Sequence, residues 1–201
     1  MLHIALTGNV AAGKSTVGRL FQSWGATLID ADQLVREAQS PGVPVLDAMA
    51  GAFGPGILNP DGSLDRASLR RRVLADEAAR HRLEAIVHPA VQRRRQQLVE
   101  EARRRGDRVA VSDIPLLFEV MDPAAFDAVV LVDAPEALRV QRLMRDRGLN
   151  EAEARQLVAS QLPSAVKREW PGRLHIIDND ADTTTLERRA RVVWEHLVAH
   201  P

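Results

Sequence analysis

A phosphate-loop motif near the N-terminus constrains the fold more than any other feature of the sequence. It runs from Gly8 to Ser15 and reads Gly-Asn-Val-Ala-Ala-Gly-Lys-Ser. The glycines let backbone amides curve around phosphate oxygens, and the loop leads into the positive end of a helix. A short apolar run, residues 2–6, precedes the motif, and a helical pattern follows from Gly13 to Gln22. The motif requires this order of strand, loop and helix, so a chance glycine-rich turn is the weaker interpretation.

Two polar residues of the motif are expected to contact ATP and its metal ion. Lys14 is expected to reach the β- and γ-phosphates of ATP, and the Ser15 hydroxyl is expected to be a ligand of Mg²⁺. Asn9 and Ala11 occupy positions where many related loops carry glycine, which leaves the backbone angles there open. Phosphate binding does not depend on those two positions.

Four further apolar runs predict the remaining strands of a parallel sheet. They cover residues 26–29, 109–112, 128–132 and 174–177. Nearly continuous apolar runs are typical of strands covered on both faces, and helical patterns separate these runs. The predicted fold is therefore α/β, with a five-stranded parallel sheet. Ligands of such sheets bind at the carboxyl ends of the strands, where several of these runs end in an aspartate.

Two segments interrupt this predicted core. The longer one, residues 33–107, is helical in pattern but is broken by several Pro-Gly and Asn-Pro turns, and we interpret it as an inserted substrate-binding subdomain. The shorter one is an Arg-rich helical pair that is broken at Gly148. The core then consists of residues 1–32, 108–140 and 165–201, and residues 181–200 are expected to form a closing amphipathic helix.

Composition excludes several classes of function. Lys+Arg and Asp+Glu each number 27, so the chain has no net charge that would attract nucleic acid or anionic lipid. It has no Cys, which removes disulfides and thiolate chemistry and fits a reducing compartment. No apolar stretch is long enough to span a membrane, so we expect a cytoplasmic enzyme.

Three aspartates at strand ends are candidates for the chemistry. Asp30 and Asp32 follow the second run, where one of them could orient an attacking hydroxyl and accept its proton. We favour Asp32 for this role, because Asp30 is equally well explained as the N-cap of the helix that follows. Asp113 ends the third run and is a candidate for holding a metal-bound water.

Other candidates have a structural alternative of similar weight. Leu116, Leu117 and Phe118, in the apolar loop after Asp113, could line a pocket or simply belong to the core. Arg142 and Arg145 could close over phosphates or belong to a solvated basic face. His88 precedes Pro89, which is expected to end a helix, and a single His is more often structural than catalytic.

Taken together, these segments resemble the dephospho-CoA kinases along nearly the whole chain. A generic nucleoside monophosphate kinase would share only the phosphate loop. The matching segments, in order, are residues 6–16, 29–32, 53–54 with 61–66, 83–89, 113–119, 142–144 and 177–179.

The resemblance implies a reaction and assigns parts to it. The γ-phosphoryl group of ATP would move to the ribose 3′-hydroxyl of dephospho-CoA, in a three-layer P-loop fold with a helical acceptor-binding insert and a helical lid, residues 141–164. Lys14, Asp32 and Arg142 would be catalytic. The remaining assignments are ATP contacts at Gly8, Ala11, Ala12, Gly13, Ser15, Thr16 and Asn179, and acceptor contacts at Thr7, His88, Leu116 and Phe118.

The resemblance leaves two matters open. Arg145 lies on the same helical side as Arg142, so either could be the lid arginine, and the chain is expected to be a monomer or a weak homo-oligomer. The rivals are another small-molecule kinase of this architecture and a nucleotide-dependent switch. The second is disfavoured because the chain has no Asn-Lys-x-Asp element of the kind that reads guanine in such switches.

Overall fold

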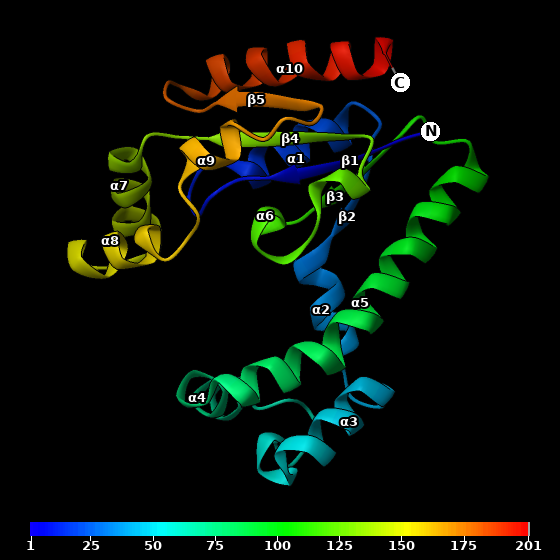
Figure 1. Ribbon diagram of the computed structural model, residues 1–201, viewed down its shortest axis with the longest axis vertical. Coiled ribbons are helices and arrows are strands. Elements are labelled where there is room, and N and C mark those ends of the chain that lie inside the picture. Colours follow the sequence, from blue (N-terminus) through cyan, green and yellow to red (C-terminus); the bar gives the residue numbers. More distant parts are fainter. Residues whose placement is uncertain (201) are drawn as a thin grey trace. The chain divides into compact units, whose positions relative to one another are not determined.

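The structure, a computed structural model, describes residues 1–200 and contains five strands joined by helices (Figure 1). The strands are β1 (Leu2–Thr7), β2 (Thr27–Asp30), β3 (Val109–Asp113), β4 (Ala128–Asp133) and β5 (Leu174–Asp178). The helices are α1 (Lys14–Ser23), α2 (Ala31–Ala38), α3 (Pro44–Phe53), α4 (Arg66–Ala75), α5 (Glu77–Arg105), α6 (Leu117–Val120), α7 (Glu136–Arg147), α8 (Glu151–Ala159), α9 (Ser164–Arg168) and α10 (Thr183–Ala199), with short 3₁₀ turns η1 (Pro55–Ile57) and η2 (Pro123–Ala125).

The strands form one parallel sheet in the order β2-β3-β1-β4-β5, which confirms the predicted α/β fold. Chain order reverses at β1, because β3 pairs with one side of it and β4 with the other. Open parallel sheets bind ligands at the carboxyl ends of the strands beside such a reversal. The register places Asp113 opposite Leu6, two residues before the phosphate loop begins at Gly8.

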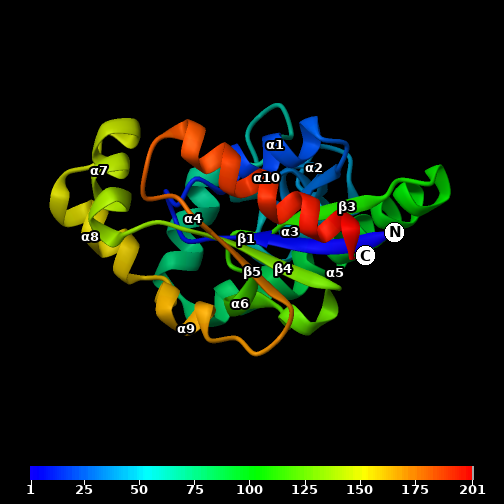
Figure 2. The ribbon, with the colours of Figure 1, turned by 90° about the horizontal axis from the view of Figure 1, so that it is seen from above.

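The chain divides into two compact units, and the larger one, residues 1–29 and 99–201, contains the sheet. Helices α1 and α10 cover one face, whereas α6 and α9 lie on the other (Figure 2). The core under α1 and α10 includes Ile4, Leu6, Phe21 and Trp194, and the rings of Phe21 and Trp194 lie 5.3 Å apart. Every residue of β3 and β4 is buried, so both faces of these inner strands are covered, as expected of parallel strands.

The smaller unit, residues 30–98, is helical and has its own core. Helices α3 and α4 and the first part of α5 bury Leu46, Met49, Phe53 and Ile57 among other apolar side chains. The Asn59 to Ser63 turn is closed by hydrogen bonds and by a single antiparallel bridge between Leu58 and Leu64. The predicted breaks at Pro41-Gly42, Gly54 and the 59–62 turn therefore lie between helices, as the sequence predicts.

The prediction that a helix ends at His88-Pro89 is wrong. Pro89 lies inside α5, which continues from Glu77 to Arg105. A proline inside a helix removes one backbone hydrogen bond and strains the preceding turn, but a long helix can continue on both sides of it. The residue before a proline disfavours the helical conformation, but here the hydrogen bonds and packing of the rest of α5 outweigh that preference.

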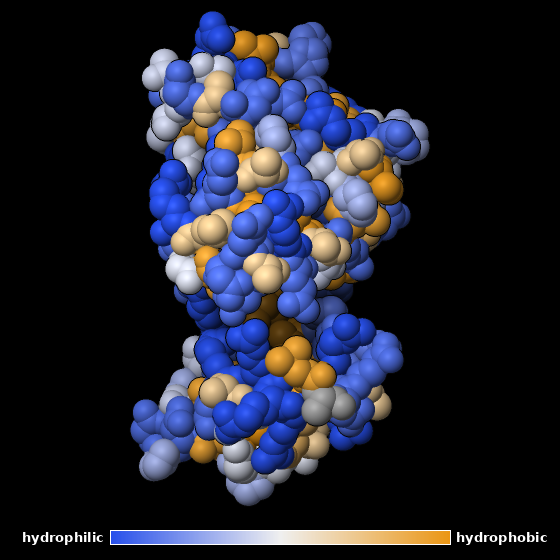
Figure 3. Space-filling model, turned by 90° about the vertical axis from the view of Figure 1, so that its left-hand side faces the viewer, coloured by the Kyte–Doolittle hydropathy of each residue, from blue (hydrophilic) through white to orange (hydrophobic). Residues whose placement is uncertain are grey.

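Polar side chains dominate the face shown in Figure 3, and apolar residues are distributed among them. Within residues 1–200, no helix has the length and apolar character needed to cross a membrane.

Candidate active site

The phosphate loop connects β1 to α1, and two of its glycines are required by close contacts. A Cβ atom on Gly8 would collide with the carbonyl oxygen of Val132 in β4. Gly13 has φ of +98°, and a Cβ there would also collide with the side-chain amide of Asn179. Only glycine fits both constraints, so the motif's glycines allow the loop to pack closely against the β4 and β5 ends of the sheet.

Ala11 is the one described non-glycine residue with a positive φ, at +59°. This left-handed conformation costs an L-residue about 1–2 kcal/mol. The Ala11 side chain packs against a small cluster formed by α7 and α8, which includes Val140 and Leu143. That contact offsets part of the cost and gives a physical reason for alanine where glycine is expected.

The loop is suited to bind an anion. Among residues 1–200, the backbone amides of Gly13, Lys14 and Ser15 have no protein hydrogen-bond partner, and they lie at the N-terminus of α1. A helix N-terminus with free amides is a phosphate-binding arrangement. Lys14 forms an ion pair with Asp113 at the end of β3, and their side chains are only 16% and 10% exposed. The ammonium group is thus held beside the loop.

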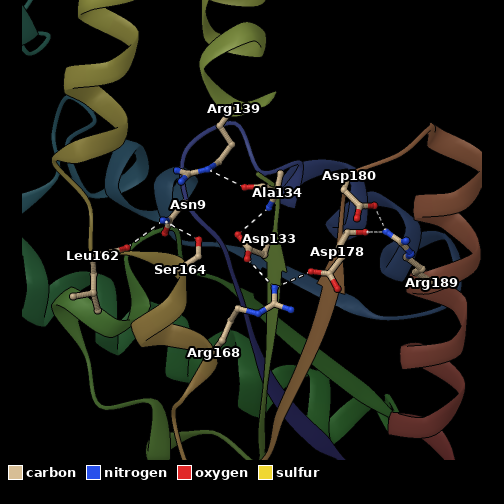
Figure 4. A network of polar contacts seen from close by, with 10 residues as sticks. All are labelled: Asn9, Asp133, Ala134, Arg139, Leu162, Ser164, Arg168, Asp178, Asp180 and Arg189. Atoms are coloured by element: carbon tan, nitrogen blue, oxygen red, sulfur yellow. Dashed lines mark hydrogen bonds and ion pairs between the residues drawn. The ribbon is translucent and has the colours of Figure 1, made fainter. Parts of the chain in front are cut away.

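The arginines of α7 differ in what they contact. Arg142 reaches the loop: its Nη1 donates to the Ala11 carbonyl and its Nη2 to the Asn179 carbonyl, both at 3.1 Å. Arg145 pairs with its neighbour Asp146, which raises the pKa of the Arg145 guanidinium, and its side chain is 74% exposed. Arg139 is buried against Ala134 (Figure 4). The geometry therefore favours Arg142 over Arg145 as the arginine next to bound phosphate.

Asn179 follows β5 and packs directly on the phosphate loop. Its Nδ2 donates to the Ala12 carbonyl at 2.8 Å, and its backbone amide donates to the Asp133 carbonyl at 2.7 Å. Arg168 bridges Asp133 and Asp178, the paired last residues of β4 and β5, at 2.8 Å from each (Figure 4). The sequence reasoning did not single out Arg168, which neutralises two carboxylates near the proposed phosphate site.

The segment after Asp113 is partly core and partly surface. Leu117 is fully buried, whereas Leu116 is 36% exposed. Phe118 is half-buried and its ring meets that of Trp170 edge to face, with centroids 6.1 Å apart. The hydroxyl of Thr7 is buried and donates to the Pro115 carbonyl at 3.3 Å, so it connects β1 to this segment. Leu116 and Phe118 therefore remain available to line a pocket, and Leu117 does not.

In the smaller unit, Asp30 at the end of β2 and Asp32 at the start of α2 have different environments. The Asp30 carboxylate accepts hydrogen bonds from the amides of Asp32 and Gln33, at 2.8 and 3.1 Å, and is the N-cap of α2. Asp32 lies in the first turn of α2 with its side chain exposed. His88 is exposed on α5. The capping explanation is thus correct for Asp30, and Asp32 has no such structural duty.

Oxygen ligands for a hard cation are present at the loop. The Ser15 hydroxyl and the Asp113 carboxylate are donors of the kind that Mg²⁺ prefers. In the described part of the chain, no three His, Cys, Asp or Glu side chains could hold a metal together. This donor set fits a Mg²⁺ ion that takes its other ligands from nucleotide phosphates and water, as is usual for this ion.

Comparison with known proteins agrees with this geometry. The family model described as dephospho-CoA kinase matches residues 2–185. Dephospho-CoA kinases from Streptomyces avermitilis and Geobacter sulfurreducens are 44% and 43% identical to the chain, over 98% and 95% of its length and 95% and 96% of theirs. A solved protein from Thermus thermophilus is 33% identical with a TM-score of 0.80, covering 98% of this chain and 97% of that one.

The solved dephospho-CoA kinase from Campylobacter jejuni shares the fold, with 21% identity, a TM-score of 0.65 and coverage of 97% of this chain and 96% of that one. The strand order, the loop between β1 and α1, and Lys14 define a P-loop kinase. Within that class the chain belongs to the dephospho-CoA kinase family, whose activity is the last step of coenzyme A biosynthesis.

Proposed function

We propose that the phosphate loop holds ATP and that its γ-phosphoryl group is transferred to the ribose 3′-hydroxyl of dephospho-CoA. The 3′-oxygen forms a bond to the γ-phosphorus, the bond from that phosphorus to the β,γ-bridging oxygen breaks, and ADP leaves. The hydroxyl proton passes to the Asp32 carboxylate. The observation that carries the proposal is the loop itself, with free amides at the start of α1 and a mostly buried Lys14 beside them.

On the nucleotide side, charge is balanced by groups that already surround the loop. Lys14 exchanges Asp113 for the β- and γ-phosphates, because the phosphates carry more charge and lie closer to the loop amides. Arg142 swings from the Ala11 and Asn179 carbonyls onto the same phosphates as the lid, residues 141–164, closes. Asn179 holds the loop beneath the nucleotide, near its adenine.

Mg²⁺ would be held by Ser15, with Asp113 binding one of its water ligands, and it would neutralise charge on the β- and γ-phosphates. Asp113 lies beside Lys14 at the end of β3, next to the strand that leads into the phosphate loop. The enzyme residues then have only to position the reactants in line and exclude water.

For the acceptor, we assign contacts to Asp32, His88, Leu116 and Phe118. Support for Asp32 comes from its exposure and its place two residues after the end of β2. Leu116 and Phe118 offer apolar surface that suits the non-polar part of an acceptor, and the exposed His88 suits its polar part.

The direct test is to incubate the protein with ATP, Mg²⁺ and dephospho-CoA and to detect CoA by mass spectrometry. CoA and ADP are expected in equal amounts. A coupled ADP-release assay with shikimate, gluconate and a nucleoside monophosphate in place of dephospho-CoA provides the comparison. Strong turnover with one of these acceptors and none with dephospho-CoA would overturn the proposal, and ADP release without any acceptor would favour a nucleotide switch.

A further inference from the structure

Lysine is almost absent from this chain. Of its 27 basic residues only Lys14 and Lys167 are lysines, and the others are arginines. Lys14 belongs to the phosphate loop, where a compact ammonium group is needed. Lys167 lies in α9 and its side chain is completely buried. A buried ammonium group must be paired, so its hydrogen-bond partners show which segments it holds together.

The partners of Lys167 come from two distant segments. Its Nζ donates to Oδ1 of Asn9, the second residue of the phosphate-loop motif, at 2.7 Å. It also donates to Oε1 of Glu119 in α6, at 2.8 Å, and lies 6.0 Å from the Phe118 ring centroid. A small ammonium group can donate in several directions at once inside such an enclosure, which the planar guanidinium of arginine cannot do in the same volume.

The bond from Lys167 also fixes which way the Asn9 amide points. Because an ammonium group can only donate, it selects the Asn9 oxygen and turns the Asn9 nitrogen to the other side. That nitrogen donates to the Leu162 carbonyl at 3.1 Å and to Ser164 Oγ at 3.3 Å (Figure 4). The next residue of the loop, Val10, donates its amide to Gln161 Oε1 at 2.7 Å. The first part of the loop is therefore fastened to the segment that joins α8 to α9.

We propose that Lys167 is a positioning residue for phosphoryl transfer: through Asn9 it holds the phosphate loop in its anion-binding conformation before ATP arrives. The inference rests on the proposed role of the loop in binding ATP. A loop that is ordered in advance loses less conformational freedom when the ligand binds, so its affinity is higher. Lys167 itself would touch neither ATP nor the acceptor, because it is enclosed by Asn9, Glu119 and Phe118.

The test compares Asn9→Ala, Lys167→Met and the double variant in steady-state assays and in direct ATP-binding measurements without acceptor. Each single variant is expected to raise KM and Kd for ATP about tenfold and to lower kcat by a smaller factor, because the loop contacts ATP in the ground state too. The double variant should be no worse than the poorer single variant, since both changes break the same link.

Two further variants separate positioning from stability. Glu119→Gln keeps an acceptor for Lys167 but removes the opposite charge, so it should lower the melting temperature and leave KM for ATP near that of the wild type. Asn59→Ala, in a turn of the smaller unit, removes an Asn side chain that is also hydrogen-bonded and should leave KM for ATP unchanged.

The outcomes are decisive in each case. Wild-type KM and Kd for ATP in folded Asn9→Ala would overturn the inference, and this variant decides alone if Lys167→Met does not fold. Additive effects in the double variant would overturn the link through Asn9. If Lys14→Ala also binds and turns over ATP normally, the proposed role of the loop fails; if only the Asn9 and Lys167 variants are normal, the role of Lys167 fails.

Discussion

The two units hold their candidate functional residues in different ways. In the larger unit, Lys14, Arg142 and Asn179 are each fixed by hydrogen bonds or an ion pair to the loop or its neighbouring strands. In the smaller unit, Asp32 and His88 lie exposed on helices. The residues proposed to bind the nucleotide are therefore held by protein contacts before a ligand binds, whereas Asp32 and His88, proposed to bind the acceptor, are exposed. Variants on the two sides should fail in different ways.

The largest effect is expected from Lys14. Lys14→Ala removes the cation that meets transition-state charge, so kcat should fall on the order of a thousandfold. Because the ion pair with Asp113 is mostly buried, the variant should also melt at a lower temperature than the wild type. Steady-state assays with ATP and dephospho-CoA, with circular dichroism as the check on folding, provide the measurement. Near-normal turnover would remove the phosphate loop from the mechanism.

The next largest effect is expected from Asp32, and it tests the acceptor side. Asp32→Asn should lower kcat roughly a hundredfold, the lower range of general base catalysis, and leave KM for ATP unchanged. Asp30→Asn is the matched control, because asparagine caps a helix about as well as aspartate and should preserve α2 and activity. Equal losses in the two variants would mean that the carboxylates act only through α2.

A smaller effect should separate two arginines of one helix. Arg142→Ala should lower kcat/KM for ATP roughly tenfold to a hundredfold, the range expected for loss of a charge-assisted hydrogen bond. Arg145→Ala should have little effect, because Arg145 is exposed and pairs with Asp146. A larger loss from Arg145→Ala than from Arg142→Ala would mean that lid closure changes which arginine faces the phosphates.

The sheet and the phosphate loop could be predicted from the sequence alone. Five apolar runs predicted the strands, because strands buried on both faces leave an almost uninterrupted signal. Gly8 and Gly13 were identified from motif spacing alone, and the close contacts of both positions explain why the motif needs them. The helix through Pro89 was predicted to end there, since a rule about one dipeptide cannot weigh the whole of α5.

The polar network around the loop could not be predicted. Lys167 and Asn9 are separated by 158 positions in the chain, and a short helix such as α9 has no periodic pattern that would mark Lys167 as buried. The scarcity of lysine was the one available signal. Arg142 and Arg145 share a helical side by spacing, and only the packing of α7 against the loop distinguishes them. The roles of Asp32, His88, Leu116 and Phe118 stay predictions.

The smallest effect concerns pH and the larger unit. Burial, and then the nearby His196 and Arg173, lower the pKa of His175 in β5. The unfolded chain, with an ordinary histidine pKa near 6.5, therefore binds a proton at higher pH than the folded protein does. Stability contributed by neutral His175 is complete above about pH 6.5 and is lost as the pH falls below it.

Thermal unfolding of the wild type and of His175→Leu between pH 7.5 and 5.5 measures this contribution. The melting temperature of the wild type should fall more steeply toward low pH than that of the variant, because leucine has no proton to take up. His196 and His200 lie next to His175, with ring centroids 5.2 Å apart for His175 and His196 and 4.6 Å for His196 and His200. His196→Gln should therefore reduce the slope only in part, since burial is the first cause of the lowered His175 pKa. If the melting temperatures of the wild type and His175→Leu fall equally with pH, His175 is not the source of the acid sensitivity. The carboxylates of the two units would then be the next groups to test.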